Sequence, residues 1–243
     1  MNRLREFAAA LMLLTRLPIW RLQWEMPIRP SDALWAYPLV GTLVGAIGAA
    51  IFALCRHVGP LPAAVLTVAV QVLIIGAMHE DGLADMADGF GGGTGRERKL
   101  EIMRDSRVGS YGALALCLLT LLRVSALAQA TQPWVALIVA ATLSRTAMLA
   151  VLATTPAARR DGLAAALADF NRAPVLAGGA IALLVALAML PLASVVAACA
   201  LALAIAALIR WLALRQIGGQ TGDVLGGVCA LTEAALLLLL SAS

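Results

Sequence analysis

The chain has 243 residues, of which 62% are hydrophobic and 13% charged, with a net charge of +4. A soluble globular domain has about 45–50% apolar and about 25% charged residues. This composition therefore excludes an ordinary soluble domain and predicts a multispanning membrane protein in contact with a lipid bilayer. Basic loops at a membrane explain the positive charge, so we expect no nucleic-acid partner. No segment between the apolar runs is long enough to bury a core, and residues 1–243 are expected to form one domain.

The N-terminal segment has a basic start and an apolar middle, as a signal peptide does. Arg16 and Pro18 stand where a cleavage site would need small residues, so we expect the segment to be retained. Residues 6–20 are short for a span of about 20 residues, and this favours a helix at the membrane interface. The segment 20–32 contains Trp and Pro and is expected to be a loop at the level of the lipid headgroups.

Seven apolar stretches follow, and each is long enough to be a membrane span or nearly so. They cover residues 33–55, 61–79, 110–130, 133–153, 173–190, 191–209 and 223–241. The expected fold class is all-α, a polytopic helical bundle with about seven transmembrane helices and an N-terminal interfacial helix. Small residues such as Gly41 and Gly45 permit close packing of helices, either within one protomer or in a homo-oligomer.

The basic residues give the orientation of the bundle, because short loops rich in Lys and Arg stay in the cytoplasm. With the N-terminus inside, the inside segments hold fifteen of the eighteen Lys and Arg residues. The loops at 80–109, 154–172 and 215–223 then face the cytoplasm. A substrate made in the cytoplasm could therefore reach all three loops.

Half of the acidic residues lie in one short segment, residues 79–112. It contains seven of the fourteen Asp and Glu residues of the chain. If the second span continues as a helix past His79, then Asp81, Asp85 and Asp88 share one face. Three adjacent carboxylates favour a hard cation such as Mg²⁺, which is typically shared with substrate phosphates. A solvated acidic helix end is the alternative interpretation.

The residues after the aspartates suggest phosphate binding. The glycine-rich stretch 89–95 lacks the Lys-Ser/Thr ending of a P-loop, and by itself it is equally consistent with a flexible linker. Arginine and lysine side chains behind it can bind phosphate oxygens, although positive-inside charge alone also explains them. The candidate substrate-binding residues of the chain are Arg96, Lys99, Arg104, Asp105, Arg107 and Arg145.

Two polar positions lie outside this segment. Asp223 is expected to cap the last span or to serve as a further ligand or base. Arg145 lies within a span, where an unpaired charge is costly, and Glu233 is a conceivable partner. Structural pairing of the charges within the spans, Arg123 included, is the alternative to a functional role.

Several motifs together resemble the cobalamin synthase family, also called adenosylcobinamide-GDP ribazoletransferases. The central one is HEDGLADMADGFGGG, followed by RERKLEIMRDSRVGSYGALAL. The stretches TRLPI, LSRTAM, DGLAAAL and GGQTGDVLGG are also similar and occur in the family's order. The resemblance covers nearly the whole chain.

The resemblance implies a late step in assembling the nucleotide loop of cobalamin. Adenosylcobinamide-GDP and α-ribazole, or its 5′-phosphate, would give adenosylcobalamin, or its 5′-phosphate, and GMP, with Mg²⁺ as cofactor. We assign the metal to Asp81, Asp85 and Asp88. The candidate catalytic residues are those three together with His79, Glu80 and Asp223, of which His79 or Glu80 is the first candidate for the base.

Three other classes fit the pattern less well. CDP-alcohol phosphotransferases have an Arg where this chain has Asp85. Aromatic prenyltransferases use two aspartate clusters, and the sequence offers one. A transporter is expected to scatter charge through the middle of the membrane, whereas here the acids gather at one boundary.

Overall fold

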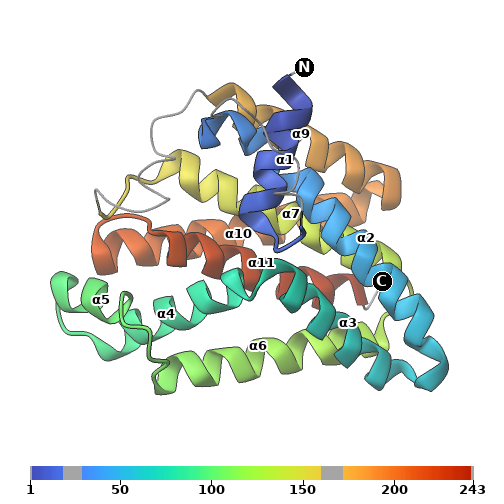
Figure 1. Ribbon diagram of the computed structural model, residues 1–243, viewed down its shortest axis with the longest axis horizontal. Helices are drawn as coiled ribbons and strands as arrows, with labels where there is room; N and C mark the ends of the chain where they lie inside the picture. Colours follow the sequence, from blue (N-terminus) through green and yellow to red (C-terminus); the bar gives the residue numbers. More distant parts are fainter. Residues whose placement is uncertain (1, 19–28, 160–171, 242–243) are drawn as a thin grey trace.

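The computed structural model describes residues 2–18, 29–159 and 172–241, and these residues form helices joined by short turns (Figure 1). The first part of the chain contains α1 (Asn2–Leu14), the 3₁₀ helix η2 (Pro30–Ala36), α2 (Tyr37–Cys55), the 3₁₀ helix η3 (Arg56–Val58), α3 (Pro60–Ile75), α4 (Met78–Gly92) and α5 (Arg96–Ile102). The second part contains α6 (Ser110–Gln129), α7 (Pro133–Thr154), α9 (Arg172–Met189), α10 (Leu192–Ile217) and α11 (Gly222–Ser241). Most of the expected loop at 20–32 lies outside the described residues.

The all-α membrane bundle is confirmed. Six described helices are long and apolar enough to cross a membrane, or up to seven spans if a bent pair counts as one. The main shift in a boundary is at α10, which continues to Ile217 rather than ending near residue 209. Arg210 therefore lies within the helix, and its Nε donates to the carbonyl of Thr154 at 3.2 Å.

The expectation of one continuous helix through 61–79 is wrong. α3 ends at Ile75, α4 begins at Met78, and the two are bent by 87° relative to each other. Gly76 and Ala77 have left-handed φ angles of 70° and 57°. Glycine adopts this conformation freely, whereas for alanine it costs about 1 kcal/mol or more. The acidic residues consequently lie on a separate helix with its own N-terminus.

The core of the bundle is formed by α7 and α11, whose most apolar stretches are 83% and 78% buried. α2 packs closely along α7 because two glycines of α2 leave room for the α7 backbone. A Cβ atom at Gly41 or Gly45 would collide with the backbone at Ala141 or Ile138. The small-residue pattern seen in the sequence therefore makes a contact within one protomer.

The two helices that carry Asp81 and Asp223, α4 and α11, lie beside each other and beside α6. In Figure 1, α4, α6 and α11 run next to each other in the lower half of the molecule, and each pair is in contact. At the point where α4 meets α11, a Cβ atom at Gly82 would stand 2.8 Å from the carbonyl oxygen of Asp223. This close approach brings the first turns of α4 and α11 together.

Candidate functional site

Carboxylates from two helices meet where α4 touches α11. Asp81 belongs to the first turn of α4, and Asp223 to the first turn of α11. Both line one cavity of about 190 Å³. Asp85, one turn further along α4, lies within electrostatic range of both. Asp81 is exposed and Asp85 is half-buried, so the described structure leaves both accessible to a ligand.

Asp88 occupies a different environment on the same helix. Its carboxylate oxygens accept hydrogen bonds from the backbone N–H groups of Gly109 at 2.7 Å and Gly112 at 2.9 Å. These are amides at the start of α6, where a helix has no partners of its own for its first N–H groups. Asp88 is only 7% exposed and therefore caps the amino-terminal end of α6. Its role as a metal ligand stays a prediction.

Arg159 was not among the residues selected from the sequence. Its guanidinium donates to Oδ2 of Asp223 at 2.7 Å, and Thr221 Oγ1 lies 3.1 Å from the same oxygen. Arg159 also lies within electrostatic range of Asp85. In the sequence it was one of many basic residues in a cytoplasmic loop. The backbone pairing of Ala157 with Gln220 that brings it to Asp223 joins distant parts of the chain.

A network of four buried charged residues lies deeper in the bundle. Arg123 of α6 donates to Glu80 and to Glu233, each at 2.7 Å. Arg145 of α7 pairs with the other oxygen of Glu233. The Arg145–Glu233 pair that the sequence suggested is therefore present. Because Arg145 is 1% exposed and held by this network, its proposed contact with substrate stays a prediction, as does Glu80 as a base.

His79 lies between this network and the cavity. It is 2% exposed and lines the cavity together with Asp81. No described residue is a hydrogen-bond partner of its Nε2 atom. His79 therefore keeps an unused polar atom next to the acidic cluster, whereas Glu80 uses one oxygen to bind Arg123.

Two of the candidate basic residues behind the glycine-rich stretch contact protein atoms. Arg96 donates to the carbonyl oxygens of Ile217 at 2.9 Å and Ala158 at 2.8 Å. Lys99 binds the side chain of Gln216. Both side chains tie α5 to the end of α10, and Arg96 also holds the segment that leads to Arg159. Arg96 and Lys99 therefore hold neighbouring segments together. Phosphate binding by these two residues stays a prediction.

The loop before α6 carries the remaining candidates, Arg104, Asp105 and Arg107. Arg107 donates to the carboxylate of Asp105, with distances of 2.6–3.1 Å. These hydrogen bonds lower the pKa of Asp105 to about 2 and raise that of Arg107. Asp105, Arg107 and Asp88 border an open hollow of about 430 Å³, while Arg104 is exposed.

The described residues contain no group of three or more His, Cys, Asp or Glu side chains that could by themselves hold a metal ion. The arrangement suits a cation that takes most of its ligands from elsewhere. Mg²⁺ usually keeps several waters and binds one or two carboxylates plus substrate phosphates. Asp81 and Asp85 are accessible carboxylates at this location, and Asp223, which is also half-buried, is bound to Arg159.

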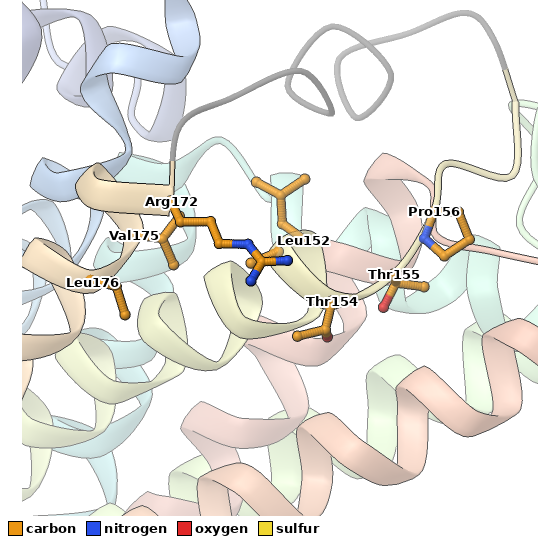
Figure 2. A pocket seen from close by; sticks show the side chains of 8 residues that line it. Leu152, Thr154, Thr155, Pro156, Arg172, Val175 and Leu176 are labelled. Carbon is orange, nitrogen blue, oxygen red and sulfur yellow. The ribbon is translucent and has the colours of Figure 1, made fainter.

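A larger hollow of about 700 Å³ lies between the end of α7 and the start of α9. Figure 2 shows Arg172 extending from α9 across the end of α7, near Leu152 and Thr154. Among the described residues that border this hollow, none is acidic. It therefore offers no carboxylate for the chemistry suggested by α4, and the smaller cavity is the better candidate site.

The family model for cobalamin-5-phosphate synthase matches residues 6–241. The chain belongs to this family. An adenosylcobinamide-GDP ribazoletransferase from Mesorhizobium japonicum is 43% identical over 98% of this chain and 93% of its own length. One from Azorhizobium caulinodans is 45% identical over 97% and 94%, and one from Pseudomonas aeruginosa 38% over 98% of both chains. No solved structure shows a significant match.

Proposed function

We propose that this protein is an adenosylcobinamide-GDP ribazoletransferase. It joins adenosylcobinamide-GDP to α-ribazole, or to α-ribazole 5′-phosphate, and releases GMP. The family match over residues 6–241 supports this reaction rather than that of a CDP-alcohol phosphotransferase, a prenyltransferase or a transporter. The observation that carries the proposal is the meeting of Asp81, Asp85 and Asp223 beside Arg159.

The side chains at this position fit a diphosphate substrate bound with a divalent cation. Asp81 and Asp85 would hold Mg²⁺, which when bound would neutralise charge on the diphosphate. Arg159 is suited to a phosphate oxygen because a guanidinium can donate two parallel hydrogen bonds. Its present partner, Asp223, shows that the guanidinium already lies at the acidic cluster. Arg104 and Arg107 add positive charge in the neighbouring loop.

The chemical step is a displacement at phosphorus. The 3′-hydroxyl of the ribazole forms a new O–P bond to the phosphorus attached to cobinamide, and the bond from that phosphorus to the GMP oxygen breaks. The hydroxyl proton goes to a base of the protein. Asp223 is the preferred base because it lines the cavity and its hydrogen bonds with Arg159 and Thr221 both use Oδ2. Asp88 is bound through both oxygens to the start of α6, and Glu80 is buried against Arg123. Catalysis of this type depends mainly on positioning and on neutralising charge.

The proposed setting is the cytoplasmic membrane of a bacterium, with α4, α5 and the turn that leads to α6 facing the cytoplasm. The chain's basic residues support this orientation because they concentrate in the segments on that side. The loop 154–172 belongs to the same side, although residues 160–171 lie outside the described part. This orientation gives substrates made in the cytoplasm access to the aspartates.

The test is GMP release by purified protein in detergent or nanodiscs. Release should require cobinamide-GDP, ribazole and Mg²⁺ together. Asp85→Asn should lower kcat/KM by about 100-fold or more, in the range found for removing a group that stabilises a transition state. Asp32→Asn, which changes an exposed aspartate on η2, is the matched control. GMP release by Asp85→Asn at the wild-type rate would contradict the role of Asp85.

A further inference from the structure

We infer that the cavity between α1, α2, α4, α7 and α11 binds the aromatic base of the ribazole nucleoside. This inference rests on the proposed function and adds a binding subsite to it. The cavity has a volume of about 190 Å³ and is bordered by residues from all five helices. Its polar rim is formed by the carboxylates of Asp81 and Asp223.

Two buried polar atoms in the cavity wall indicate a ligand. They are the hydroxyl oxygen of Tyr37 and Nε2 of His79, and neither has a hydrogen-bond partner among the described residues. Both side chains are 2% exposed and both line the cavity. Buried polar atoms are normally hydrogen-bonded, so an unsatisfied one needs an explanation. A ligand atom that accepts or donates a hydrogen bond inside the cavity supplies it.

The rest of the wall is mostly apolar. It consists chiefly of Leu13 and Leu14 of α1, Met148 and Leu152 of α7, and Leu225 of α11. Pockets that enclose drug-sized ligands measure about 300–1,000 Å³. A cavity of 190 Å³ is therefore suited to a single ring system and too small for a corrinoid.

The three ring systems in the proposed reaction differ in what they require of such a wall. A corrinoid is excluded by size. Guanine presents several donors and acceptors around its edge, and each needs a partner when it is buried. The base of a ribazole is a dimethylated benzimidazole, with an apolar edge and one free ring nitrogen. It matches a wall of Leu and Met side chains with a tyrosine hydroxyl as donor.

The position of the cavity also agrees with the chemical step. A base bound beside Tyr37 and His79 would place its ribose toward Asp81 and Asp223, because these carboxylates border the same cavity. The 3′-hydroxyl would then lie near Asp223, the proposed base. α1 supplies part of the wall, so the N-terminal helix becomes part of the nucleoside site.

The first test removes one hydroxyl group. Tyr37→Phe should raise KM for α-ribazole by about 2- to 10-fold, as expected for the loss of one hydrogen bond. KM for cobinamide-GDP and kcat should stay within twofold of wild type. The matched control is Tyr111→Phe at the chain's other tyrosine, which is 56% exposed and should change neither KM. A Tyr37→Phe effect on cobinamide-GDP alone would assign the cavity to guanine and overturn the inference.

The second test changes the size of the cavity. Met148→Phe should lower kcat/KM for α-ribazole relative to the nucleoside of unmethylated benzimidazole by about 10-fold, because a filled pocket discriminates between ligands that differ by a methyl group. A general distortion of the bundle by the substitution would lower kcat/KM equally for α-ribazole and for the unmethylated nucleoside. An unchanged ratio would contradict the inference.

Direct binding separates this inference from the proposed function. Free dimethylbenzimidazole is fluorescent, and its emission should change on titration with wild-type protein without any turnover. The change should be weaker with Tyr37→Phe and insensitive to GMP. Wild-type protein that binds the base but releases no GMP would contradict the proposed function alone. Active wild-type protein whose bound base is displaced by GMP, or that binds no base, would contradict this inference alone.

Discussion

Glu233 of α11 and Arg123 of α6 form an ion pair at 2.7 Å, and their side chains are only 5% and 3% exposed. The second oxygen of Glu233 binds Arg145 of α7, so one carboxylate joins three helices. Removing one member of a buried pair leaves an uncompensated charge, which typically costs about 3–5 kcal/mol. Glu233→Gln should therefore lower the free energy of unfolding by that amount in detergent, as measured by denaturant titration.

The control for this prediction is Glu97→Gln, because the side chain of Glu97 is 82% exposed. Its effect should stay within about 0.5 kcal/mol. Equal stability of the two variants would show that the Glu233 network does not stabilise the bundle.

The different environments of two aspartates on α4 predict different defects. Asp88→Ala leaves the amides of Gly109 and Gly112 without partners and should cost about 2 kcal/mol of stability. Asp85→Ala should abolish most activity while the unfolding midpoint stays near that of wild type. Thermal unfolding and GMP release measured on the same preparations test both statements. A stable but inactive Asp88→Ala protein would favour Asp88 as a metal ligand instead.

The α5 arginines offer a comparison within one helix. Arg96 donates to two carbonyl groups on other segments, whereas Arg98 forms a pair with Glu101 in which both side chains are more than 60% exposed. Arg96→Gln should reduce stability by about 1–3 kcal/mol and should lower activity by displacing the segment before Arg159. Arg98→Gln should change stability by less than about 0.5 kcal/mol. If Arg96→Gln and Arg98→Gln change stability and GMP release by the same amount, the contacts of Arg96 with the two carbonyl groups have no specific role.

Arg159 should act on the diphosphate substrate. Arg159→Gln removes the positive charge beside Asp223, and we expect KM for cobinamide-GDP to rise by about 10-fold, with a smaller change in KM for α-ribazole. Steady-state kinetics with each substrate varied in turn measures both. Arg56→Gln, on the 3₁₀ helix at the far end of α2, is the control. A rise in KM for α-ribazole alone would argue against phosphate binding by Arg159.

The Asp105–Arg107 pair gives a pH prediction. The hydrogen bonds from Arg107 lower the pKa of Asp105 from 3.8 to about 2. The pKa of Asp105 in the folded protein lies below its ordinary value, so the ion pair with Arg107 stabilises the folded protein above pH 3.8. This stabilisation is lost as the pH falls through about 2. Carbon-13 NMR of the Asp105 carboxyl should show this midpoint, and Arg107→Gln should return it toward 3.8. A midpoint that is the same in both proteins would mean that the pair does not form in solution.

The sequence predicted the apolar helices well because a span needs a long apolar run with few charges, and such runs are visible directly. The break at Gly76–Ala77 was missed because the surrounding residues are as apolar as those of a continuous span. Asp81 and Asp85 were found because their spacing is local. The partnership of Asp223 with Arg159 and the capping of α6 by Asp88 depend on contacts between residues far apart in the sequence, which periodicity does not reveal.

The break after α3 has an electrostatic consequence. Because the chain starts a new helix at Met78, the amino-terminal ends of α4 and α11 both lie at the acidic cavity. Each end of this kind carries a partial positive charge from the helix dipole, which stabilises a nearby anion by about 0.3–1 kcal/mol at an exposed position. An unbroken helix would have put no dipole end beside Asp81. The turn therefore places two helix amino-terminal ends beside the carboxylates of Asp81 and Asp223.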